Sequence, residues 1–194
     1  MERIGKQEPV CIDNDLPFAV PEGWTWARLG EIGEWSAGST PDRGYLPFYK
    51  GGTIPWLKTG ELNNGVVTDT EEKITELALQ NCPLKLNKVG DVLIAMYGAT
   101  IGQLAIAGIP LTTNQACCAC SLYKEINNWY LFYFLMANKS EFIELGAGGA
   151  QPNISRQILV DFLLPLPPLA EQARIVSKVE ELLEELDEME KAVG

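Results

Sequence analysis

The chain has 194 residues, of which 46% are hydrophobic and 21% are charged, and it carries a net charge of −11 without any histidine. A chain of this length and composition folds around a buried core, which excludes wholesale disorder. The N-terminal residues MERIGKQEPV lack the apolar centre of a signal peptide, and the longest apolar run, residues 129–137, is about half of a membrane span. We therefore expect a soluble, cytoplasmic protein.

Several kinds of chemistry are excluded by groups that the sequence lacks. Without histidine there is no Ser-His or Cys-His pair and no imidazole metal ligand. The phosphate-binding patterns GxxxxGK[ST] and GxGxxG are also missing, and the five cysteines include no CxxC pair. Cys117, Cys118 and Cys120, with Cys82, supply four thiols, but their strand-like context favours small buried hydrophobic residues. We predict no catalytic residue, no metal site and no cofactor in this chain.

The first half of the chain is rich in turn residues. Residues 1–15 are polar and aperiodic, as in a linker, and residues 16–32 open the folded body with two tryptophans and several aliphatic residues. The segments GSTP (38–41), GGTIPW (51–56) and KTG (58–60) are typical of loops. Residues 70–81 (TEEKITELALQN) begin with acids and continue with spaced apolar residues, which predicts a short helix.

The second half alternates apolar strands with helices. VLIAM (92–96) and IGQLAIA (101–107), joined by YGAT, predict a hairpin, and residues 116–122 predict a third strand. Residues 129–138 are hydrophobic on all sides, as in a buried helix, and GAGGA (146–150) is a loop followed by a short helix capped by Asn153 or Ser155. Because there is no regular βαβ alternation, we assign the fold to the α+β class.

The last thirty residues predict a helical arm. Three prolines in LPLPP (164–168) end the preceding structure, so a helix begins at about Leu169. At 1.5 Å per residue, a helix to the end of the chain is about 37 Å long. Its apolar residues follow steps of four and three, which is a coiled-coil heptad pattern. The predicted helix-pairing positions are Ile175, Val179, Leu182, Leu186, Met189 and Val193.

The apolar stripe of this arm is broad, because Val176 and Leu183 extend it to one side. A broad stripe suits packing within a helical bundle. Residues 169–194 also carry eight acidic and three basic residues, most of the acids lying away from the stripe. We expect the arm to pair with another helix; the alternative is that it folds back on its own body.

One interpretation of the sequence as an enzyme is a metal-dependent nuclease. Pro41-Asp42 and Glu71-Glu72-Lys73 together spell the PD…ExK pattern of such enzymes. Both halves are common in a chain rich in Glu and Lys, and the ExK part falls where we predict a helix rather than a strand. A third interpretation is a coiled-coil interaction scaffold with no role in DNA binding.

Five segments carry a resemblance to a known family. The segments are PEGWTWARLGEI (21–32), GSTP to GGTIPWLKTGEL (38–62), GDVLIAMYGATIGQLAI (90–106), TTNQACCA (112–119) and QPNISRQILVDFLLPLPPLAEQARIVSKVEEL (151–182). The most distinctive are GDVLIAMYGATIG and the PLPPLAEQ junction. Together they resemble the specificity subunit of type I restriction-modification systems, and the likeness covers roughly residues 16–190.

The resemblance implies a non-catalytic subunit that reads DNA for its partners. It implies a target recognition domain at residues 16–168 followed by a spacer helix at residues 169–194. Family members have two such units, which read the two halves of a split site, so one unit implies a half-subunit or a fragment that works as a homodimer or with a second half. The implied partners are double-stranded DNA, the methyltransferase subunits and, through the complex, the restriction subunit. S-adenosylmethionine, and ATP and Mg for cleavage, are expected in those partner subunits.

Candidate DNA-binding residues are the polar side chains of the glycine-rich loops, because base edges are read by hydrogen bonds and phosphates by cations. Lys50, Lys58 and Arg156 are equally well explained as solvated surface charges. The Tyr97 to Thr100 turn also serves folding, and Asn114 and Gln115 either bond adenine or tie down a neighbouring loop. The full set is Ser39, Thr40, Arg43, Lys50, Lys58, Thr59, Tyr97, Thr100, Thr113, Asn114, Gln115, Gln151, Asn153 and Arg156.

Overall fold

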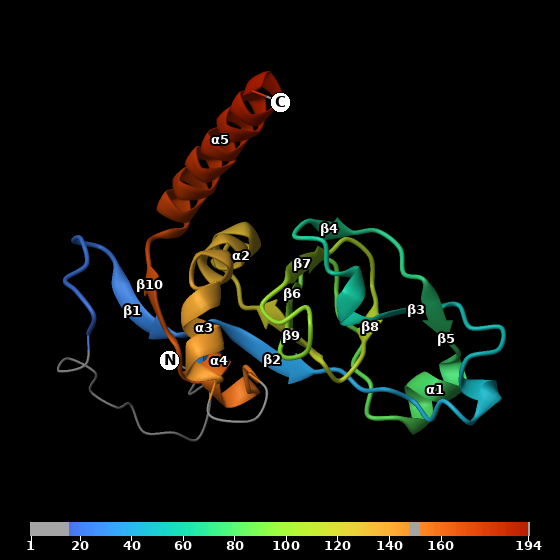
Figure 1. Cartoon of the computed structure of the whole chain (residues 1–194). Helices are drawn as coiled ribbons and strands as arrows, with labels where there is room; N and C mark the ends of the chain where they lie inside the picture. The colour runs from blue at the N-terminus through green and yellow to red at the C-terminus, as the bar shows by residue number, and fades with distance from the viewer. Residues whose placement is uncertain (1–15, 148–151, 194) are drawn as a thin grey trace.

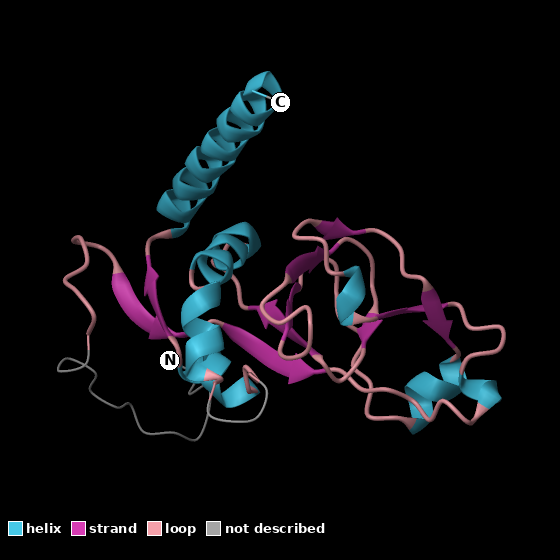
Figure 2. Ribbon diagram, viewed as in Figure 1, coloured by secondary structure: helices cyan, strands magenta, loops and turns pink. Residues whose placement is uncertain are grey.

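A computed structural model describes residues 16–147 and 152–193 as a body of mixed helices and strands from which one long helix projects (Figure 1). Figure 2 shows one group of helices between the strands of the body and a further short helix at its far end, without a regular βαβ alternation, which agrees with the predicted α+β class. The strands are β1 (Thr25–Arg28), β2 (Gly33–Ala37), β3 (Ile54–Leu57), β4 (Val66–Val67), β5 (Glu72–Ile74), β6 (Val92–Ala95), β7 (Leu104–Ala107), β8 (Thr112–Thr113), β9 (Cys117–Leu122) and β10 (Leu163–Leu166). The helices are α1 (Glu76–Asn81), α2 (Asn128–Ala137), α3 (Lys139–Leu145), α4 (Arg156–Asp161) and α5 (Leu169–Val193), with 3-10 turns η1 (Leu29–Glu31), η2 (Leu46–Phe48) and η3 (Thr59–Glu61).

A five-stranded sheet in the order β2-β9-β6-β7-β4 forms the centre of the body. The predicted hairpin is confirmed, since β6 and β7 pair antiparallel with Leu93 opposite Ala105. The predicted third strand is β9, which lies antiparallel between β2 and β6. Both faces of this sheet are covered. Cys118 and Cys120 face one hydrophobic cluster and Cys117 faces the other, as the alternation in the sequence predicts.

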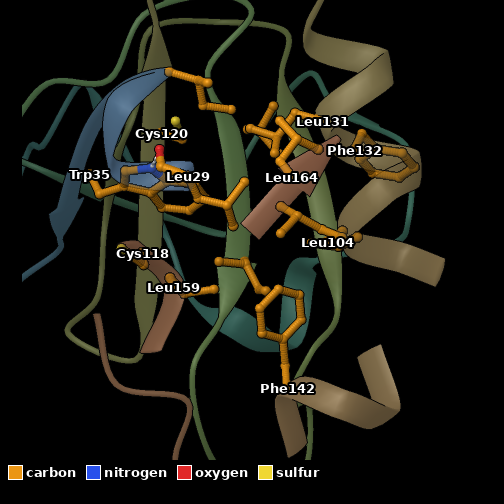
Figure 3. Close-up of a cluster of buried hydrophobic side chains, with 14 of the residues drawn as sticks. Leu29, Trp35, Leu104, Cys118, Cys120, Leu131, Phe132, Phe142, Leu159 and Leu164 are labelled. Atoms are coloured by element: carbon orange, nitrogen blue, oxygen red, sulfur yellow. Dashed lines mark hydrogen bonds between the residues drawn. The ribbon is translucent and has the colours of Figure 1, made fainter. Parts of the chain in front are cut away.

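The larger hydrophobic cluster lies between the central sheet and the helices (Figure 3). Leu104 and Cys118 contribute from the sheet, and Leu131 and Phe142 contribute from α2 and α3. The helix predicted at residues 129–138 is confirmed as α2, and Asn127 caps it by accepting hydrogen bonds from the amides of residues 129 and 130. Burial on this scale is the main stabilising contribution to the fold, at about 25 cal/mol per Å² of apolar surface.

A smaller three-stranded sheet, β5-β3-β8, forms a lobe at the far end of β2 (Figure 1). The single helix predicted over residues 70–81 is wrong in its first half: β5 occupies Glu72–Ile74, and only Glu76–Asn81 forms α1. The reason is tertiary, because Ile74 pairs with Ile54 of β3 and is fully buried. Thr75 then caps α1 by accepting from the amide of Ala78, so the strand ends where the helix begins.

A separate two-stranded ribbon joins the first strand of the body to its last. β1 and β10 pair antiparallel, with Trp26 opposite Pro165. The proline-rich segment is extended in β10, and Pro165 is tolerated because β10 has a partner strand on one edge only. The helix α5 begins at Leu169, directly after Pro167 and Pro168, as predicted.

The two halves of α5 have different surroundings. Gln172 and Val176 are buried against the body, and Ile175 packs against the same core. From residue 180 onward all side chains that are described are exposed, including Leu182 and Leu186. Figure 1 shows this second half projecting away from α2 and the ribbon. Among the described residues, no helix is long and apolar enough to cross a membrane.

Candidate nucleic-acid interface

Most of the predicted DNA-binding residues gather at one end of the central sheet. The C-terminal ends of β2 and β6 and the N-terminal end of β9 meet there, because Ala37 pairs with Cys118 and Ala95 pairs with Cys117. The loops that follow or precede these strands therefore start from the same edge. We call this edge the polar sheet end; its predicted and exposed or half-buried members are Ser39, Thr40, Tyr97, Thr100, Asn114, Gln115, Asn153 and Arg156.

The loop after β2 is tied to the loop before β9. Ser39 donates its amide hydrogen to the carbonyl oxygen of Thr113 at 2.9 Å, and the Thr40 hydroxyl donates to the side chain of Gln115. The side-chain oxygen of Asn114 accepts from the amide of Ala116 at 3.2 Å. The Gln115 side chain therefore links its loop to the loop after β2 and remains exposed beside Thr40, whereas the Asn114 side chain bonds within its own loop.

Thr113 does not belong to the surface on which it was predicted. Its side chain is only 1% exposed, because β8 lies in parallel contact with β3, with Thr113 opposite Leu57. A buried threonine cannot reach a base or a phosphate. Its predicted role as a DNA contact is wrong, and its carbonyl oxygen instead fixes Ser39.

The β6–β7 loop meets the segment before α4 at the same end. Tyr97 forms a β-bridge with Asn153, and the amide of Ile154 donates to the carbonyl oxygen of Met96 at 2.8 Å. Ser155 caps α4, as predicted, and the guanidinium of Arg156 donates to the carbonyl oxygen of Trp35 while the side chain stays exposed. Gln151 and residues 148–150 lie outside the described residues. The contacts place Tyr97, Asn153 and Arg156 on neighbouring backbone segments.

Two predicted cations lie in the adjacent lobe and share one carboxylate. Arg43 pairs with Glu72 through both guanidinium nitrogens, and Lys58 lies 3.1 Å from Glu72 and 2.9 Å from Glu71. The Arg43 guanidinium also stacks on the rings of Tyr49 and Trp56, 4.9 and 4.6 Å from their centres. The hydrogen bond from Arg43, and next that from Lys58, hold the pKa of Glu72 below its usual value.

The sequence predicted only part of this cluster, which consists of Arg43, Tyr49, Trp56, Lys58 and Glu72. Arg43 and Lys58 were predicted as candidate DNA-binding residues, whereas Glu72 was placed on a helix. Because Arg43 and Glu72 are far apart in the sequence, their ion pair was not predicted. The cluster borders the polar sheet end, because the indole of Trp56 donates to the carbonyl oxygen of Ser39 at 3.0 Å. Of the remaining predicted residues, Lys50 is exposed beyond η2 and Thr59 is half-buried at the start of η3.

The residues of the PD…ExK pattern are engaged in other contacts. The argument that placed ExK on a helix is wrong, because Glu72 and Lys73 lie on β5. However, Glu72 is neutralised by Arg43 and Lys58, and Asp42 accepts a hydrogen bond from the amide of Gly44. In the part of the chain that the structure describes, no group of three His, Cys, Asp or Glu residues is placed to hold a metal ion.

A large cavity lies elsewhere on the body. It has a volume of about 800 Å³ and opens between the β1–β10 ribbon, α2, α3 and α4. Its walls include Phe18, Trp26, Phe134, Leu145 and Phe162, so they are mainly apolar. Nucleic acid is bound through polar and cationic groups, and the cavity does not have that character.

The predicted helix-pairing positions divide into two sets. Ile175 and Val179 are half-buried near the body. Part of each side chain is therefore already covered and cannot contact another chain. Leu182, Leu186 and Met189 are 46%, 55% and 64% exposed and form a continuous free stripe with Leu183. The side chain of Val193 lies outside what the structure describes. The alternative that the whole arm folds back on the body is wrong for this second half.

The architecture matches solved structures of one kind. A structure described as showing the complex assembly and conformational transition of the type I R-M system aligns with a TM-score of 0.74 and 24% identity, covering 91% of this chain and 42% of that chain. The crystal structure of the HsdS subunit from Thermoanaerobacter tengcongensis aligns with a TM-score of 0.72 and 23% identity, covering 91% and 41%. At these identities the likeness establishes the fold, a mixed α+β body with a long helix.

Sequence comparison gives the family. The family described as type I restriction modification DNA specificity domain matches residues 21–193. The specificity subunit of the type I restriction enzyme EcoR124I/EcoR124II from Escherichia coli is 28% identical over 173 residues, and that of MjaIX from Methanocaldococcus jannaschii is 32% identical over 163 residues. The chain belongs to the family of type I restriction modification DNA specificity domains, as the resemblance in its sequence implied.

The chain is much shorter than these relatives. The matches cover 87% and 81% of this chain but only 42% and 37% of the two curated relatives. The chain spans less than half the length of these two relatives.

Proposed function

We propose that this chain is a non-catalytic DNA-recognition subunit that reads one half of a bipartite site and docks methyltransferase subunits. The observation that carries the proposal is the convergence of exposed and half-buried polar side chains from separate loops at the polar sheet end of a family member. Such a set of amides, hydroxyls and one arginine has the hydrogen-bonding groups that base edges and phosphates require.

In the proposed complex the cofactors belong to the partner subunits. In this proposal the modification subunits hold S-adenosylmethionine, and the restriction subunit uses ATP and Mg, all within the cytoplasm. The acidic charge of this chain supports the arrangement, because a net charge of −11 opposes tight DNA binding by the chain alone. The target recognition domain corresponds to residues 16–168 and the spacer helix to residues 169–194.

Two copies of the chain complete the bipartite reader. The free stripe of Leu182, Leu183, Leu186 and Met189 is apolar and exposed, so pairing of two arms removes it from water. A homodimer of this kind reads a palindromic interrupted site, whereas pairing with a different half reads an asymmetric one.

Mapping of methylated adenines tests the proposal most directly. We expect a host that expresses this chain with cognate modification subunits to gain adenine methylation at one interrupted sequence. The double variant Gln115→Ala with Asn153→Ala, at the polar sheet end, should lose or relax the recognised half-site. Lys124→Ala is the matched control, because Lys124 is exposed just beyond the opposite end of β9. Unchanged methylation in the double variant, or no methylation with the wild-type chain, contradicts the proposal.

A further inference from the structure

Gln172 is the polar side chain buried at the root of the arm. It lies in the first turn of α5 and is 1% exposed, although glutamine is normally a surface residue. Its side-chain oxygen accepts from the amide of Asn127 at 2.8 Å. Its side-chain nitrogen donates to the carbonyl oxygens of Pro167 at 2.9 Å and Glu125 at 3.3 Å. One amide group therefore ties α5 to two backbone segments, the β9–α2 loop and the linker before α5.

These segments meet where the body joins the arm. We call the linker at this junction, residues 165–168, the elbow. Asn127 caps α2, the helix against which α5 packs, and Glu125 has a positive φ of 74°, which L-residues rarely adopt. Pro167 belongs to the linker that enters α5. On the far side of the linker, the Tyr130 hydroxyl of α2 donates to the carbonyl oxygen of Pro165. The elbow is thus held to α2 by side-chain hydrogen bonds at both of its ends.

The remaining contacts of α5 with the body do not fix its direction by themselves. Val176 and Ile175 pack into an apolar surface, and the hydrophobic effect that drives this burial is non-directional, although side-chain packing favours some crossing angles over others. Hydrogen bonds have a required length and angle, so three from one planar amide restrict how α5 can tilt. Beyond Val179 all the side chains of the arm that are described are exposed.

A small tilt at this root is enlarged at the far end. From Gln172 to the end of α5 the helix is about 32 Å long, so a tilt of about 10° moves the end by about 5 Å. This displacement equals one to two base pairs of DNA at about 3.4 Å each. An arm that measures the gap between two half-sites must therefore be held firmly at its root.

We propose that Gln172 is a positioning residue that sets the exit direction of the arm, and through it the gap length between the two half-sites. The step from arm direction to gap length rests on the function proposed above; the step from Gln172 to arm direction does not. Gln172 contacts no DNA in this account and acts through Asn127, Glu125 and Pro167.

Arm direction is measured in the chain alone, without DNA. Spin labels are placed on Lys88→Cys in the body and Glu188→Cys on the arm, both exposed, with Cys11 and Cys82 replaced by serine. Gln172→Met keeps the length of the side chain but removes all three hydrogen bonds. We expect the distance distribution between the labels to broaden about twofold in Gln172→Met, as tilts of about 10° require. Arg174→Ala, on the exposed face of the same turn, is the control and should leave the distribution unchanged. An unchanged distribution in Gln172→Met overturns the proposal.

Two further measurements keep the test decisive. Amide hydrogen exchange on the wild-type chain should show Asn127 protected like the residues within α2, so exchange at the rate of an open loop also overturns the proposal even if Gln172→Met does not fold. In the methylating complex, Gln172→Met should accept gaps one or two base pairs longer or shorter than the wild-type gap, with both half-sites unchanged. If the distance distribution broadens in Gln172→Met but neither the wild-type chain nor the variant supports methylation, the proposed function fails while the role of Gln172 in arm direction stands.

Discussion

At the scale of single residues, Glu72 in the lobe and Gly38 at the polar sheet end each depend on partners that are distant in the sequence. Glu72 satisfies Arg43 and Lys58 together, and Arg43 is further held by the rings of Tyr49 and Trp56. The stacked guanidinium is therefore a fixed part of the lobe rather than a mobile surface charge. A DNA phosphate that approaches this lobe has to compete with Glu72 for both cations.

Acid should weaken the lobe through Glu72. Because Arg43 lowers its pKa in the folded chain, the ion pairs contribute fully above the unfolded pKa, near the usual 4.5, and are lost as the pH falls through the lower folded pKa. We expect Glu72→Gln to reduce the free energy of unfolding at pH 7 by about 0.5–1 kcal/mol. The variant should also lose less stability than the wild type between pH 5 and pH 3. Urea unfolding at several pH values measures both effects, with Glu22→Gln as an exposed control; parallel pH curves for Glu72→Gln and wild type contradict the prediction.

Gly38 allows two loops to approach closely. A methyl group at this position overlaps the carbonyl oxygen and hydroxyl of Thr113, both on the segment that binds Ser39. We expect Gly38→Ala to destabilise the fold by about 1–3 kcal/mol through overpacking. Gly60→Ala is the matched control, because nothing lies within 4 Å of its added carbon and its φ is not positive. Equal melting temperatures of the two variants contradict this explanation.

At the scale of elements, α5 is one helix with two functions. Its first turns complete the core of the body through Val176, whereas its second half presents the free stripe to solvent. The boundary falls near Val179, in the middle of a continuous heptad pattern. The pattern alone therefore cannot tell which apolar positions are already covered by the body.

Substitutions in the two halves should have separate effects. We expect Leu182→Glu with Leu186→Glu to abolish self-association without lowering the melting temperature of the body, since both side chains are about half exposed. Val176→Glu should instead destabilise the body by about 2–4 kcal/mol, because it buries a charge in the core. Sedimentation and thermal unfolding distinguish the cases, with Glu184→Gln and Glu188→Gln on the exposed face as controls. An oligomer that persists in the double variant rejects pairing through the free stripe.

Elements defined by local patterns could be predicted from the sequence, and those defined by distant partners could not. The prolines before Leu169, the apolar hairpin of β6 and β7, and the apolar run of α2 are local, and each was predicted correctly. The strand β5 was missed because its acids resemble a first helical turn, while its pairing with β3 depends on residues about twenty positions away. The burial of Thr113 and the Arg43–Glu72 pair were missed for the same reason.

At the scale of the whole molecule, charge sets how the chain can meet DNA. The net charge of −11 is concentrated partly on α5, but the body also has more acidic than basic residues. Counterion release increases the affinity for DNA only where a cation contacts a phosphate. Two of the predicted cations, Arg43 and Lys58, are already paired with Glu72. The body therefore has few groups available to hold the DNA backbone.

Weak DNA binding by the isolated chain is the expected result. We predict a Kd of about 1 μM or weaker that rises steeply with salt, and much tighter sequence-specific binding once the modification subunits supply further phosphate contacts. Fluorescence anisotropy at several salt concentrations, with and without those subunits, measures the difference. Nanomolar, sequence-specific binding by the chain alone contradicts the prediction.

The β1–β10 ribbon has a consequence for how such proteins diversify. Because β1 and β10 are neighbours, the chain enters and leaves the body at one place, next to the start of α5. A genetic crossover at that place transplants the whole body, core included, onto a foreign helix. If the body reads DNA as proposed above, such exchanges give new target preferences without rebuilding a binding surface one codon at a time.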